Sequence, residues 1–190
     1  MIVKLTIYKK MMLGFGVIII IMIIASTYIL FKLNAVSNAA EMTLTANVQV
    51  VDLAKQLQDI LQDLNVDAQK YIISRDETYF SLFVATSRQF DQLLNSLLNA
   101  SSDKTERSII RNMFQAHESF TVSMRNERDS QETGYNPVRD NRRSESLRIL
   151  YKSLDHLINS NQVSIENAMS RMKTTTSRSA KVALLLIVLT

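Results

Sequence analysis

The sequence predicts an all-α protein: an antiparallel, up-down-up-down four-helix bundle with an N-terminal transmembrane helix and the start of a second one. Three observations predict this class. The chain has a long uncharged run near its start and a shorter one at its end. Between the two runs, glycine and proline occur in one place only, from Gly134 to Pro137. Apolar residues there recur at steps of three and four, the spacing of one helix face.

The first element is a predicted membrane-spanning helix at Met11–Phe31. Its 21 residues carry no charge, and as a helix they extend about 31 Å, the thickness of a bilayer's hydrocarbon core. The run is too long for the apolar part of a usual signal peptide, so we expect an uncleaved anchor. Three lysines precede the run and only Lys32 closely follows it, which places residues 1–10 in the cytoplasm.

An extracytoplasmic domain is predicted at residues 33–180. Without the five lysines that flank the apolar runs, 17 Lys and Arg remain against 18 Asp and Glu. The basic isoelectric point, about 9.4, therefore belongs to the membrane flanks, and nucleic acid is not an expected partner. We expect a multi-pass protein of the inner (cytoplasmic) membrane with its bundle in the periplasm. The chain has no cysteine, so no disulfide can form within it.

Three breaks divide this domain into four predicted helices, each long enough to pack along its neighbours. Because the connections are short, consecutive helices are expected to run antiparallel. The predicted helices lie at about 33–73, 77–99, 103–132 and from 138 into the second apolar run.

Capping residues justify the first two breaks, and Gly134–Pro137 marks the third. At the first break, Ser74 or Asp76 is the expected N-cap, with Glu77 completing a capping box three residues after Ser74. At the second break, Asp103 and Glu106 have the spacing of another capping box.

Each helix has a predicted buried seam with steps of three and four, typical of helices packed at shallow angles. The seam of the fourth helix becomes polar towards its end, where Asn and Ser occupy positions that Leu occupies earlier. The first helix likewise has a polar residue, Asn47, near its membrane-proximal end. We expect the membrane-proximal end to be loosely specified and able to shift. The predicted seam residues are Leu57, Leu61, Leu64, Ala68, Tyr71; Phe80, Phe83, Ser87, Phe90, Leu94, Leu97; Ile110, Met113, His117, Phe120, Met124; Leu147, Leu150, Leu154, Leu157, Asn161, Ser164, Ala168, Met172, Thr175 and Ser179.

The last element is the uncharged run Val182–Thr190. As a helix it covers about 13 Å, less than half a bilayer. We expect it to begin a second crossing, truncated here, and the chain to be part of a longer protein.

Few residues have a spacing that indicates chemistry. His117 and His156 do not form an H-E-x-x-H motif, so no metal site is predicted, and no Gly-rich loop predicts a nucleotide cofactor. His117 is followed by Glu118, as in a kinase phosphoacceptor helix, but Thr121 stands where such a helix has proline. We interpret His117 as a seam histidine that is hydrogen-bonded to a neighbour. No Ser, His and carboxylate grouping is recognisable, so no catalytic residue is predicted.

Aromatic residues at helical spacing could form a ligand box, but we interpret them as core packing. They are Tyr71, Tyr79, Phe80, Phe83, Phe90, Phe114 and Phe120.

The candidate ligand-binding residues are arginines near the first and third breaks, which should meet at the membrane-distal end. Guanidinium groups bind carboxylates well, so a small anionic molecule is a candidate ligand. The alternative is a solvated loop in which nearby acids, Asp129, Glu132, Asp140 and Glu145, are the partners. The candidate residues are Arg75, Arg125, Arg128, Arg139, Arg142 and Arg143.

Two short segments and the overall layout resemble a known family. The segments are Lys9–Phe15 (KKMMLGF), at the start of the first apolar run, and Lys70–Asp76 (KYIISRD), which is followed by Tyr79 and Phe83. With the helical layout, they resemble the four-helix-bundle sensory modules of bacterial transmembrane receptors: sensor histidine kinases and methyl-accepting chemotaxis receptors. The resemblance implies that a second crossing leads to a HAMP signal-relay module and a cytoplasmic output domain.

The sequence-based interpretation is therefore the sensory and membrane-spanning input segment of a bacterial receptor that acts as a homodimer. A two-component sensor histidine kinase is the expected full-length protein, so the enzyme activity would lie outside this segment. The expected stimulus is a small molecule or a partner protein. Two alternatives remain open: a methyl-accepting chemotaxis receptor, and a membrane-tethered interaction protein that sends no signal.

Overall fold

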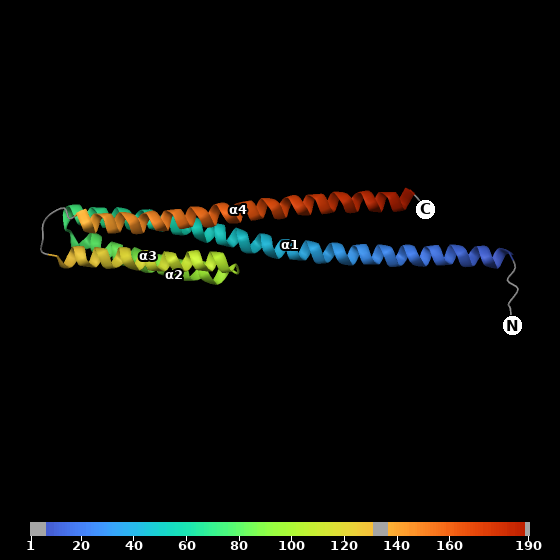
Figure 1. The fold of residues 1–190 in the computed structure, drawn as a ribbon, viewed down its shortest axis with the longest axis horizontal. Coiled ribbons are helices and arrows are strands. Elements are labelled where there is room, and N and C mark those ends of the chain that lie inside the picture. The colour runs from blue at the N-terminus through green and yellow to red at the C-terminus, as the bar shows by residue number, and fades with distance from the viewer. Residues whose placement is uncertain (1–6, 131–136, 189–190) are drawn as a thin grey trace. The chain divides into compact units, whose positions relative to one another are not determined.

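The protein is helical throughout its described part. The computed structural model describes residues 7–130 and 137–188, with side chains at 12–28, 31, 41–130 and 140–174. These residues form four α-helices and no strand, which confirms the all-α prediction. The helices are α1 (Ile7–Ser74), α2 (Glu77–Ala100), α3 (Lys104–Asp129) and α4 (Pro137–Val188) (Figure 1).

The chain divides into two compact units. One unit is Thr43–Ala168, which contains all of α2 and α3 with parts of α1 and α4. The other combines Met1–Met42 with Met169–Thr190. The predicted extracytoplasmic domain, 33–180, contains the whole of the first unit.

In the unit that contains the start of α1, the helix displays large apolar side chains. From Met12 to Tyr28 these side chains, apart from the less exposed Met22, are about half to two-thirds exposed. The side chains of Met11, Ile29 and Leu30, which belong to the predicted crossing, lie outside the described residues. Among the described residues, no helix combines the length and the hydropathy that a membrane crossing requires. The side chains of 182–190 also lie outside the described part.

In the Thr43–Ala168 unit, one core receives side chains from all four helices. Every predicted seam residue of α1, α2 and α3 is buried, and so are Leu150, Leu154, Leu157 and Asn161 of α4. The helical period thus identified most of the core, but not Val50, Val51, Ala54, Ala116 and Ile158. Past Asn161 the seam opens, since Ser164 is exposed, as the polar substitutions predicted. The remaining seam residues of α4 are partly exposed (Leu147, Ala168, Met172) or outside the described side chains (Thr175, Ser179).

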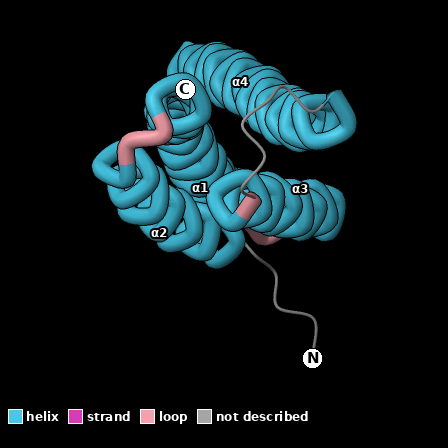
Figure 2. The backbone as a smooth tube through the Cα atoms, turned by 90° about the vertical axis from the view of Figure 1, so that its left-hand side faces the viewer, coloured by secondary structure: helices cyan, strands magenta, loops and turns pink. Residues whose placement is uncertain are grey.

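Helices α2 and α3 form the closest pair in this unit, and they lie side by side in Figure 1 and Figure 2. The Phe83 and Phe120 rings meet edge to face with centroids 5.7 Å apart. Tyr71 of α1 joins the same aromatic group, 5.2 Å from Phe80. All but two of the predicted aromatic residues are buried, and Tyr79 and Phe114 are half-buried, which confirms core packing.

The first break is capped by Asp76. Its carboxylate accepts a hydrogen bond of 2.8 Å from the backbone N–H of Thr78, a typical N-cap contact. The alternative cap, Ser74, was wrong, because its hydroxyl donates instead to the Lys70 carbonyl at 2.7 Å. Glu77 does not complete a capping box either, since its carboxylate pairs with Arg128 at 3.2 Å.

The second break is capped by Asp103, as predicted. Its carboxylate accepts from the backbone N–H groups of Thr105 and Glu106, at 2.7 and 3.0 Å. The reciprocal half of the predicted capping box does not form. The Glu106 carboxylate accepts instead from the side chains of Ser101 and Asn161, which draw it away from the helix start.

Arg75 makes the turn between α1 and α2 with a left-handed backbone, φ 56°. Glycine is the usual residue in this conformation, and a non-glycine residue costs about 1–2 kcal/mol there. The Arg75 backbone N–H closes the helix by donating to the Tyr71 carbonyl at 2.7 Å. The contacts of the Arg75 side chain, described below, offset this cost.

Candidate functional site

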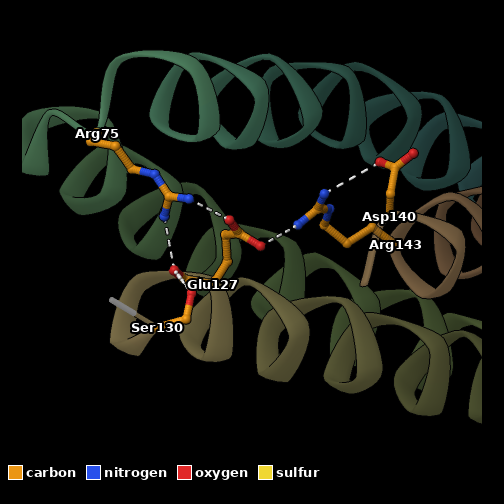
Figure 3. A network of polar contacts seen from close by, with 5 residues as sticks. All are labelled: Arg75, Glu127, Ser130, Asp140 and Arg143. Carbon is orange, nitrogen blue, oxygen red and sulfur yellow. Dashed lines mark hydrogen bonds and ion pairs between the residues drawn. The ribbon is translucent and has the colours of Figure 1, made fainter. Parts of the chain in front are cut away.

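The end of the bundle near Arg75 contains an ionic group around a buried glutamate, which we call the Glu127 cluster: Arg75, Glu127, Asp140 and Arg143 (Figure 3). Glu127 is 4% exposed. One carboxylate oxygen pairs with Arg75 at 2.7 Å and the other with Arg143 at 3.0 Å. Arg75 also donates to the Glu127 carbonyl at 2.9 Å, and Arg143 reaches Asp140 at 3.3 Å. The α1–α2 turn, through Arg75, and α4, through Arg143, therefore both bind the Glu127 carboxylate of α3.

The position of each charged residue follows from the helical period. Glu127 lies three residues after Met124, and Arg75 lies four after Tyr71, so each takes the next step of its buried seam. Arg143 stands one turn before the first leucine of the α4 seam. A buried carboxylate must be paired, because an isolated charge costs several kcal/mol to desolvate. Two guanidinium groups supply that pairing.

The six predicted ligand arginines are thus not gathered in one site. Arg75 and Arg143 are bound to Glu127. Arg128 pairs with Glu77 and lies 4.7 Å from the Phe80 ring centroid. Of the predicted local partners, Asp140 does bind an arginine of the set.

The remaining predicted arginines lie elsewhere. Arg125 and Arg142 are exposed, and neither has an ion-pair partner among the described residues. Arg142 lines two adjoining surface grooves between α3 and α4, of about 470 and 520 Å³. Arg125 lines a groove between α2 and α3. The side chain of Arg139 lies outside the described residues.

A second polar group, the His117 cluster, joins α2 to α3 and consists of Ser87, Asp91, His117 and Thr121. Ser87 and His117 are buried, whereas the Asp91 side chain is half exposed. His117 is 3% exposed. Its Nδ1 lies 2.9 Å from the Asp91 carboxylate, and its Nε2 lies 3.2 Å from the Ser87 hydroxyl, which in turn is 3.4 Å from the Thr121 hydroxyl. The imidazole packs on Phe90 with centroids 4.6 Å apart. The predicted hydrogen-bonded seam histidine is confirmed.

Burial lowers the pKa of His117 below its ordinary value of 6.5, while the charge of Asp91 and its hydrogen bond oppose that shift. His117 is therefore neutral at pH 7. Nδ1–H then donates to Asp91, and Nε2 accepts the hydrogen of the Ser87 hydroxyl.

Carboxylate, imidazole and hydroxyl follow the order of a serine nucleophile's triad, which the sequence spacing did not reveal. The surroundings favour a structural role, however. Ser87 is 7% exposed and lies in the middle of α2. Backbone N–H groups at such a position are bonded within the helix, so they cannot stabilise an oxyanion.

The His117 cluster forms the floor of a surface groove of about 550 Å³ between α2 and α3. Arginines from both helices line it, Arg88 from α2 and Arg125 from α3. Apolar side chains line it as well. Sequence reasoning missed Arg88, because nothing in its spacing sets it apart from the other exposed charges of the bundle. The groove also contains Val84, Ser87, Asp91, Asn95, Phe114, His117, Glu118, Thr121 and Val122.

A third polar contact joins α3 to α4 near the second break. The Asn161 side-chain amide donates to the Glu106 carboxylate at 2.7 Å. Asn161 is 1% exposed. Arg107 donates to the carbonyls of Leu98 and Ser101, at 3.0 and 3.1 Å, which satisfies the end of α2. Two polar contacts therefore bind α4 to α3: Arg143 with Glu127 at one end of the grooves between these helices, and Asn161 with Glu106 at the other.

The described residues contain no group of three or more His, Cys, Asp or Glu that could hold a metal ion. No family model, curated protein or solved structure matches the chain.

Proposed function

We propose that this chain is the input segment of a bacterial signal-transduction receptor, with two membrane crossings and an antiparallel four-helix bundle outside the cytoplasm. A sensor histidine kinase is the proposed full-length protein, and the receptor acts as a homodimer in the inner membrane. The proposal rests on the sequence features described above and on the structural features that follow.

The observation that supports it best is the apolar surface of α1. Large apolar side chains between Met12 and Tyr28 are exposed around the helix, with Met12, Phe15 and Ile24 each about 65% exposed. Such a surface needs a cover. Since the run Met11–Phe31 has no charge in 21 residues, the hydrocarbon of a bilayer is the proposed cover.

Pairs of residues support the antiparallel order. Along α2 and α3, Glu77 meets Arg128 while Ser87 meets His117, so residue numbers rise along one helix as they fall along the other. Between α3 and α4 the same holds: Glu127 pairs with Arg143, and Glu106 with Asn161.

The proposed mechanism is a small shift of α4. Beside the buried leucines that α4 contributes to the common core, its contacts with α3 include the polar ones of Arg143 and Asn161. It also meets α1 through an exposed hydrogen bond of 2.7 Å between Gln58 and Asp155. Polar contacts of this kind can be exchanged, so α4 can occupy more than one position. A stimulus shifts the balance only if it binds the two positions with different affinity.

Reporter fusions test the topology directly. An enzyme that is active only outside the cytoplasm, fused after Glu106, should be active in a bacterial host, and the same enzyme fused after Lys10 should not. A cytoplasmic reporter at the same two places should give the reverse pattern. Activity of the cytoplasmic reporter at Glu106 would overturn the receptor proposal.

A further inference from the structure

The groove between α2 and α3 has features of a binding site that the Glu127 cluster lacks. Its volume, about 550 Å³, lies within the range of small-molecule sites. The charges of the Glu127 cluster are bound to one another. In the groove, by contrast, neither Arg88 nor Arg125 has an ion-pair partner among the described residues. Two guanidinium groups, one from each helix, are therefore available to a ligand.

Guanidinium groups favour an oxyanion, and a carboxylate can accept two parallel hydrogen bonds from one guanidinium. The acids of the groove limit the charge of that ligand. Asp91 accepts from His117, and Glu118 also lines the groove, so the groove contains two carboxylates as well as two arginines. An anion with several charges would be repelled by these acids, whereas a single negative charge is tolerated.

The walls of the groove favour an apolar body on the ligand. Val84 and Phe114 are half-buried and Val122 is 44% exposed, and all three line the groove. An apolar group of the ligand that packs on this wall would bury its own surface and that of the wall away from water. The buried floor, where His117 and Ser87 satisfy each other, needs no partner from the ligand.

We propose that the α2–α3 groove binds a small monocarboxylic acid with an apolar body, its carboxylate on Arg88 and Arg125 and its body on Val84, Phe114 and Val122. The further claim that this acid is the stimulus of the receptor depends on the proposed function. The claim that the groove binds the acid does not depend on it. The two proposals fail separately, since the fusions above test topology and the experiment below tests binding.

The test uses the full chain in detergent micelles with ¹⁵N-labelled histidine. The chain has two histidines: His117 under the groove, and His156 exposed on α4 and away from it. The probes are benzoate, benzyl alcohol without the charge, and inorganic phosphate without the apolar body. Benzoate should shift the His117 imidazole resonances saturably and leave those of His156 unchanged.

The variants Arg88→Gln and Arg125→Gln should each weaken benzoate binding about tenfold, the loss of one charge-assisted hydrogen bond. Both side chains are exposed, so folding should persist, which circular dichroism checks. Arg111→Gln, an exposed arginine of α3 outside the groove, is the matched control and should bind as the wild type does. No saturable shift, equal binding of benzyl alcohol or phosphate, or an equal effect of Arg111→Gln would overturn the proposal.

Discussion

Glu127 and His117 lie ten residues apart on α3, and each is almost completely buried. The bundle accommodates them by opposite means. Glu127 is stabilised by ion pairs, because each of its carboxylate oxygens binds one guanidinium group. His117 is held in its neutral form, because burial lowers its pKa. The comparison shows that a polar residue in a helical seam can be stabilised by pairing or by loss of charge, and that each solution is sensitive to a different perturbation.

The largest expected effect comes from Glu127→Gln, which keeps the shape but removes the charge. Two guanidinium groups would then lose their common carboxylate, and breaking a buried pair costs about 3 kcal/mol or more. Denaturant unfolding of the detergent-solubilised chain, followed by circular dichroism, measures the loss.

Glu118→Gln is the matched control for that variant, because Glu118 lies on the same helix and is exposed. Its effect should stay within about 0.5 kcal/mol. If Glu127→Gln also stayed within about 1 kcal/mol of the wild type, the Glu127 cluster would not be the stabilising contact described here.

A smaller effect is expected from two variants that distinguish the backbone contribution of Arg75 to stability from its side-chain contribution. Arg75→Ala and Arg75→Gly both remove the guanidinium from Glu127, but only glycine adopts the φ of 56° without strain. The glycine variant should therefore be more stable than the alanine variant by about 1 kcal/mol. Comparison of the two unfolding curves checks this, and an alanine variant as stable as the glycine one would show that the turn relaxes.

The smallest expected effect is that of pH on the His117 cluster. Because the pKa of His117 is lowered in the folded chain, the unfolded chain binds more protons at this site below about pH 6.5. The free energy of unfolding should therefore fall as pH drops below about 6.5. The measurement compares unfolding at several pH values for the wild type and His117→Gln. If both lost stability equally with falling pH, His117 would not be the residue responsible.

The period of the sequence was enough to predict most of the core, because burial in a bundle depends on spacing more than on residue identity. The same rule could have located the Glu127 cluster. Glu127 and Arg75 take the next steps of their seams, and Arg143 lies one step before its own. The two arginines were interpreted as candidate ligand-binding residues, and Glu127 was given no role. A charge on a seam position is the signal that sequence analysis can use.

Other features could not be predicted, because they depend on distant partners. Glu106 has the spacing of a capping box with Asp103, yet Asn161, 55 residues away, binds its carboxylate instead. The left-handed backbone of Arg75 has no local signal, since the segment contains no glycine. The α2–α3 groove likewise requires Arg88 and Arg125 to be placed together by helix packing.

The turn at Arg75 has a consequence for the order in which the bundle assembles. Its guanidinium binds Glu127, which lies 52 residues later in the chain. When the first two helices have just left the ribosome, that carboxylate is not yet free to bind the guanidinium. We therefore expect the α1–α2 hairpin to remain open during synthesis and to close only when the end of α3 arrives, which makes this connection one of the last parts of the domain to become ordered.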